Sequence, residues 1–74
     1  MKFQLVKRWK VDNISMMEWE SNVEKTSKYD SNGIMKLIKR GYEVSYHNGF
    51  YCMKRIEKVG ISSITTYMIL EAVG

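Results

Sequence analysis

The sequence contains no proline, one cysteine (Cys52) and one histidine (His47) among its 74 residues. A single cysteine can form neither a disulfide within the chain nor a zinc cluster built on several cysteines. Small secreted domains usually carry several disulfides, so we expect this protein in the reducing cytoplasm. The first residues lack the apolar core of a signal peptide, and no stretch approaches the roughly 20 apolar residues of a membrane span. We therefore expect no membrane contact.

Signatures of chemistry are also scarce. The glycine-rich motifs of nucleotide sites are absent, so we expect no cofactor. The run Asp30-Ser31-Asn32-Gly33 begins like a calcium loop, but Gly41 stands where that loop requires a glutamate. His47 has no second ligand at a metal-binding spacing, so we predict no metal site. Cys52 and His47 are the residue types of a nucleophile and its base, but no oxyanion loop or orienting third group accompanies them. We predict that the protein is not an enzyme.

What is present indicates one small globular domain covering residues 1–74. The 45% hydrophobic and 27% charged residues are typical of a folded domain rather than a disordered chain. Twelve basic residues stand against eight acidic ones, and a net charge of +4 favours an acidic partner surface. Ligand sites usually need clefts of several hundred Å3, and we expect no room for a deep pocket in a chain this short.

Residues 2–11 alternate in polarity. Phe3, Leu5, Trp9 and Val11 fall on one side, with Lys7 as an interruption, and this period of two predicts a half-buried strand.

The next segment has two interpretations. Ser15-Met16-Met17-Glu18 fits a capping box, and apolar Met16, Trp19 and Val23 follow at helical spacing, which predicts a helix over residues 15–27. Residues 14–19 also fit a short strand that pairs with the first one.

A second helix is predicted over residues 32–40. Ser31 or Asn32 supplies its N-cap, and Ile34, Leu37 and Ile38 form an apolar stripe. Gly41 follows at the left-handed position that commonly ends a helix.

Asn48-Gly49 lies between two alternating runs, from Tyr42 to Arg55, and is the strongest short-range signal for a hairpin. A two-residue loop pairs Glu43 with Lys54, which have opposite charges. Val59-Gly60 predicts a second two-residue loop before a last strand from Ile61 to Ala72, with Met53 opposite Thr66. The predicted order is β-α-α-β-β-β, an α+β fold in which one or two short helices pack on one face of a small antiparallel sheet.

The hairpin register assigns side chains to two faces of the sheet. The predicted core face carries Tyr42, Val44, Tyr46, Tyr51, Met53, Arg55, Ile64, Thr66, Met68 and Leu70. The other face is mixed yet holds Phe50, Ile56, Tyr67 and Ile69, more apolar area than a solvated face needs. A slip of one residue would exchange the two faces.

These features favour a small non-catalytic intracellular protein that binds a partner protein as an inhibitor or adaptor. Its predicted anchors are Phe50, Tyr67 and Ile69, while Lys54, Arg8 and Lys10 steer it to an acidic surface. A homodimer through this face or through an edge strand is the simplest form. The alternative is a basic module for single-stranded nucleic acid or DNA, since lysines and arginines are interleaved with aromatic residues. Free-standing chains of this size are common in phages and mobile elements.

Overall fold

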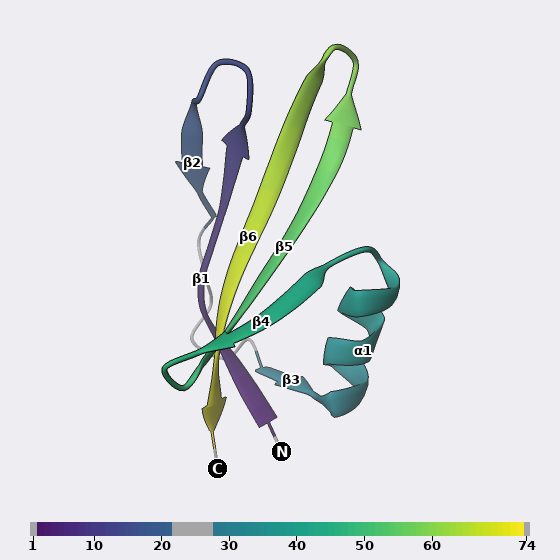
Figure 1. Cartoon of the computed structure of the whole chain (residues 1–74). Coiled ribbons are helices and arrows are strands. Elements are labelled where there is room, and N and C mark those ends of the chain that lie inside the picture. The colour runs from purple at the N-terminus through teal and green to yellow at the C-terminus, as the bar shows by residue number, and fades with distance from the viewer. Residues whose placement is uncertain (1, 22–27, 74) are drawn as a thin grey trace.

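The computed structural model describes residues 2–21 and 28–73 and arranges them as a six-stranded antiparallel sheet with one helix (Figure 1). In chain order the elements are β1 (Lys2–Asp12), β2 (Glu18–Glu20), β3 (Lys28–Asp30), α1 (Ser31–Lys39), β4 (Glu43–His47), β5 (Phe50–Val59) and β6 (Ser62–Val73). The fold is α+β in character, but its order is β-β-β-α-β-β-β rather than the predicted β-α-α-β-β-β. In the part of the chain that the structure describes, no helix is long and apolar enough to cross a membrane.

The sheet is built on the long strands β1, β6 and β5. The strand order is β2-β1-β6-β5-β4, and β3 pairs with the start of β1 on the same edge as β2. Figure 1 shows α1 beside β4 and β3, while the far ends of β5 and β6 extend well beyond the helix. One half of the sheet is therefore backed by the helix and the other half is not.

The predicted helix over residues 15–27 is wrong where the structure describes this segment. Residues 18–20 form β2, which pairs with the far half of β1, as the alternative interpretation had it. Ser15 does not cap a helix, because strand β2 begins at Glu18; its Oγ accepts a hydrogen bond from the Met17 amide at 3.2 Å within the turn. The Asp12 Oδ1 accepts from the Ile14 amide at 2.9 Å, and this closes a turn instead of starting a helix. Residues 22–27 lie outside the described residues.

The β4–β5 hairpin has the predicted register, with Glu43 opposite Lys54. Asn48 and Gly49 have φ values of 50° and 86°, as a type I′ turn requires. The second hairpin turns at Gly60 and Ile61, so Met53 faces Met68 instead of Thr66. The predicted register was thus wrong by two residues, and a shift of two leaves every side chain on its predicted face.

A β-bulge divides β1 into two halves. Leu5 lies opposite Leu70 and Lys7 opposite Ile69, so Val6 is an extra residue with no partner on β6. An extra residue reverses the alternation beyond it. Phe3 and Leu5 therefore face the core, as predicted, whereas Trp9 and Val11 point to the opposite side of the sheet, contrary to the prediction.

The buried core lies on one face of the sheet, which we call the core face. Its members are Phe3, Leu5, Leu37, Met53, Met68 and Leu70.

The helix that covers this core matches the predicted one within a residue at each end. Leu37 is its buried contact, and its N-cap is Asp30, whose carboxylate accepts from the Gly33 amide at 2.8 Å, rather than Ser31 or Asn32. Tyr46 was predicted to be in the core, but it is 63% exposed because β4 is an edge strand.

Candidate functional site

The opposite face of the sheet, which we call the outer face, carries a hollow of about 440 Å3. The side chains that define it come from four strands: Trp9 from β1, Ser45 from β4, Cys52 and Lys54 from β5, and Tyr67 and Ile69 from β6. This hollow is an open groove and not a deep pocket, the kind of cavity that so short a chain was expected to lack. The four strands twist across one another, and the face that α1 leaves bare becomes a shallow groove.

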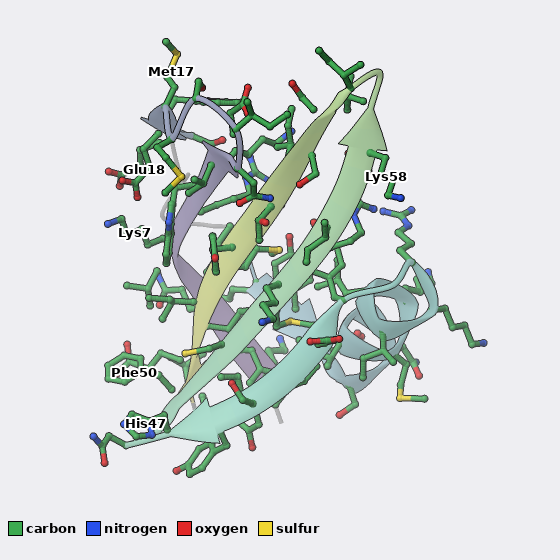
Figure 2. All side chains as sticks on the ribbon, turned by 45° about the horizontal axis from the view of Figure 1, so that its top comes forward. Lys7, Met17, Glu18, His47, Phe50 and Lys58 are labelled. Atoms are coloured by element: carbon green, nitrogen blue, oxygen red, sulfur yellow. The ribbon has the colours of Figure 1, made fainter. Side chains whose placement is uncertain are left out.

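Three of the predicted site residues meet in this groove. Lys54 lies directly opposite Tyr67, and Ile69 follows two positions along β6, opposite Cys52. Phe50 shares the outer face but lies at the end of β5, next to His47 (Figure 2). Phe50, which was predicted as an anchor of the outward face, is therefore not part of the groove.

The other two predicted residues are on the wrong side of the sheet to join them. Arg8 lies opposite Met68 and Lys10 opposite Thr66, so both belong to the core face. They lie on the far half of β1, beyond the bulge. The six residues are thus divided between two faces and cannot contact one partner surface together.

Trp9 is one of the groove residues that were not predicted as site residues, together with Ser45 and Cys52. Its indole stacks on the Tyr67 ring with centroids 5.0 Å apart and planes 13° from parallel. The Lys7 ammonium lies 4.7 Å from the centre of the Trp9 ring, in cation–π contact. The interruption of the alternation at Lys7 was the one signal of the bulge that brings Trp9 to this face.

Charges of both signs are interspersed on the outer face. According to the strand registers, this face carries three lysines and four glutamates: Lys7, Lys54, Lys58, Glu18, Glu20, Glu43 and Glu71. Figure 2 shows Lys7 and Glu18 along the same side of the molecule, with Lys58 near the tip of the β5–β6 hairpin. The net charge of +4 is therefore not concentrated around the groove. Among the described residues the one ion pair joins Arg55 to Glu57 at 2.6 Å, so the Lys54 ammonium has no carboxylate partner there.

His47 and Cys52 both lie on the outer face. His47 is exposed opposite Phe50, while Cys52 is half-buried opposite Ser45. Within residues 2–21 and 28–73 there is no group of three or more histidine, cysteine or acidic side chains that could hold a metal ion.

A second apolar surface lies at the far end of the molecule. The β1–β2 turn is tied to β6 by Asn13, whose Nδ2 donates at 2.8 Å to the hydroxyls of Ser63 and Thr65. This brings the turn beside the tip of the β5–β6 hairpin (Figure 1). Large apolar side chains are exposed on the turn and at the tip of the hairpin, and the polarity pattern of the strands did not predict this surface: Ile14, Met16, Met17, Val59 and Ile61.

Comparisons with protein-family models, with curated proteins and with solved structures gave no match for this chain. The functional proposal therefore depends on the groove and the surfaces around it.

Proposed function

We propose that this protein is a small, non-catalytic binding protein of the inhibitor or adaptor type, which holds a partner protein in the outer-face groove. The observation that carries the proposal is an apolar groove on a sheet face that the helix leaves bare. Its lining includes Cys52 and Ile69, which are half-buried opposite one another, and the stacked rings of Trp9 and Tyr67. Tryptophan and tyrosine are the residues most often found where binding energy concentrates in protein interfaces.

The groove selects for a particular chemistry in the partner. A hollow of about 440 Å3 has room for one or two apolar side chains. Lys54 stands at its rim without a carboxylate partner among the described residues. We infer that the partner inserts an apolar side chain next to an aspartate or glutamate that reaches Lys54. The partner therefore needs one carboxylate near Lys54 rather than a broad acidic patch. The single cysteine of the chain suits a cytoplasmic setting.

Base stacking fits this groove less well. One face of the Trp9 ring is against Tyr67, and the Lys7 ammonium lies over the ring as well. Proteins that bind single strands combine free aromatic faces with a continuous positive groove, and here glutamates alternate with the lysines. The stacked pair is better suited to act as a rigid wall for an apolar side chain.

The proposal is tested by site-dependent capture of a protein from the source cells. Ile69→Gln places a polar amide in the apolar lining of the groove, and we expect it to reduce capture at least about tenfold, the effect of roughly 1.4 kcal/mol. Lys54→Gln removes the rim charge and should weaken capture in low salt more than in high salt. Ile38→Gln makes the same change on the exposed face of α1 and is the matched control.

Circular dichroism establishes that each variant is folded before it is used. Equal capture by the wild type, Ile69→Gln and Ile38→Gln would mean that the groove is not the binding site.

Arg8 and Lys10 support a second candidate, a nucleic-acid contact on the core face. They lie on the far half of β1, two residues apart, where the sheet extends beyond α1. Phosphate contacts make binding strongly salt-dependent, so a labelled oligonucleotide should bind in low salt and be released as salt rises. The double change Arg8→Gln and Lys10→Gln should abolish that binding while partner capture through the groove continues. Absence of oligonucleotide binding in low salt would exclude this candidate.

A further inference from the structure

The outer edge of β4 has no strand partner among the described residues. β4 ends the sheet order and pairs only with β5, and all five of its residues are exposed. An unpaired edge presents a row of backbone donors and acceptors that can pair with another strand. Proteins usually protect such an edge with charged residues, above all lysine, with proline or with a bulge. Glu43–His47 has no lysine, proline or bulge, and its one acidic residue, Glu43, stands at the first position of the strand.

The hairpin geometry determines which backbone groups point outward. A two-residue loop at Asn48-Gly49 makes His47 and Phe50 a hydrogen-bonded pair, and such pairs then occur at every second position. Glu43, Ser45 and His47 therefore direct their amides and carbonyls to β5. Val44 and Tyr46 direct theirs to the open edge.

We propose that two copies of this chain associate by antiparallel pairing of β4 with β4, around a twofold axis at Ser45. In this register the outward amide and carbonyl of Val44 form two hydrogen bonds with those of Tyr46 in the second copy. Tyr46 forms the same two bonds with Val44 of the second copy, so the contact contains four backbone hydrogen bonds. Successive residues of a strand point to opposite faces, so a continuous sheet requires each pair across the contact to join two even-numbered or two odd-numbered residues. Ser45 is the middle residue of β4, so a twofold axis at Ser45 is the position that gives all five residues of the strand a partner.

The side chains are self-complementary in this arrangement. Val44 and Tyr46 are 40% and 63% exposed on the core face, and each would cover the other across the new pair. Aromatic and β-branched residues form favourable cross-strand pairs. On the outer face, Glu43 faces His47 of the second copy, so an imidazole N–H can donate to a carboxylate oxygen. No like charges are brought opposite one another.

At the His47 end of β4 the new contact lies clear of the helix. Figure 2 shows the His47 end of β4 projecting at the opposite side of the molecule from α1. Pairing would join the two sheets into one continuous sheet and bring the two outer-face grooves to either side of the axis. A five-residue strand pair buries less than the about 1,600 Å2 of a standard interface, so the association should depend on concentration.

Disulfide trapping tests the register directly. Residues of a non-hydrogen-bonded pair have Cα atoms about 4.5 Å apart, which a disulfide can span. Ser45→Cys should therefore link two copies across the axis. The substitution is made with Cys52→Ser, because Cys52 lies opposite Ser45 on β5 and would otherwise compete within the chain. The control is Lys39→Cys, also with Cys52→Ser, on the exposed surface of α1.

In a glutathione buffer we expect the linked dimer to form at least about ten times faster from Ser45→Cys than from Lys39→Cys. Equal rates would overturn the proposal. A third variant, Tyr46→Cys, tests the register. If it forms the linked dimer faster than Ser45→Cys, the axis lies at Tyr46 and the proposed register is wrong.

Sedimentation equilibrium gives an independent measurement. The mass of the wild type should rise towards that of a dimer as the concentration approaches about 1 mM, the range of a weak association. The double change Val44→Lys and Tyr46→Lys should remain monomeric, and circular dichroism should show it to be folded because both side chains are exposed. A wild type that stays monomeric throughout would refute the proposal. Ile69→Gln should leave the self-association unchanged, so failure of the groove hypothesis and failure of this one can be distinguished.

Discussion

Deletion of Val6 should be tolerated, although it removes a residue from the interior of a central strand. Val6 is the extra residue of the bulge, so its removal makes Lys7 follow Leu5 directly. Leu5 then still faces Leu70 and Lys7 still faces Ile69, and every other pair of the β1–β6 ladder is kept. The deletion converts a bulged ladder into a regular one without moving any side chain to another face.

The expected cost is small. Val6 is 47% exposed, so about half of the roughly 1.5–3 kcal/mol gained by burying a valine is lost, or about 1 kcal/mol. A domain of 74 residues is stabilised by roughly 4–11 kcal/mol in total. The shortened chain should therefore remain folded.

Deletion of Ile69 is the matched control. Ile69 separates the buried Met68 and Leu70 on β6, whose pairing with β5 contains no bulge. Without it those two neighbours must point to opposite faces, so one of them leaves the core at a cost of about 2–5 kcal/mol. Urea unfolding followed by tryptophan fluorescence measures both costs, and near-ultraviolet circular dichroism reports on the stacked Trp9 and Tyr67. If deletion of Val6 is as destabilising as deletion of Ile69, the bulge has been assigned incorrectly.

Three further results are expected. Leu70→Ala should lower the free energy of unfolding by about 2–5 kcal/mol, because Leu70 is 0% exposed, and a smaller loss in urea titration would mean that the core collapses around the cavity. Asn13→Ala should cost about 1–3 kcal/mol, because the buried Thr65 hydroxyl loses its donor, and faster amide exchange at the tip would report it. The Asp12 pKa is lowered from 3.8, chiefly by the hydrogen bond from the Ile14 amide, so its contribution is present above pH 3.8 and lost as the pH falls through the lower folded value. The stability difference between the wild type and Asp12→Asn should accordingly shrink on acidification, and a constant difference would contradict this cause.

Features encoded by neighbouring residues could be predicted from the sequence. Asn48-Gly49 determines its own hairpin, because both residues adopt positive φ and the loop length sets the register. The helix ending before Gly41 was also predictable, since its apolar stripe and its C-terminal glycine are local signals.

The segment after Asp12 shows where local signals fail. Ser15 and Glu18 have capping-box spacing, but a helix this short gains little until it packs against a core. Pairing of Trp19 with Lys10 on β1 is a tertiary contact that the local pattern does not contain.

The bulge accounts for what was missed at the site. One unpaired residue, Val6, moves Trp9 into the groove and places Arg8 and Lys10 on the other face. In an alternating sequence an extra residue is visible only as a break in the alternation of polar and apolar residues. In residues 2–11 that break is Lys7. Lys54, Tyr67 and Ile69 share the outer face as predicted, because they lie on strands without a bulge and a register shift of two residues keeps each side chain on its face.

The pairing of β1 with β6 determines how this chain must fold. It brings Lys2 against Val73 and continues along both strands, so almost the whole sequence separates the partners. Closing so large a loop loses chain entropy before any of these contacts form. The strands β4, β5 and β6 follow one another directly, so they can assemble first and present an edge to which β1 docks late. We therefore expect substitutions in the β5–β6 hairpin to slow folding, and substitutions in β1 chiefly to speed unfolding.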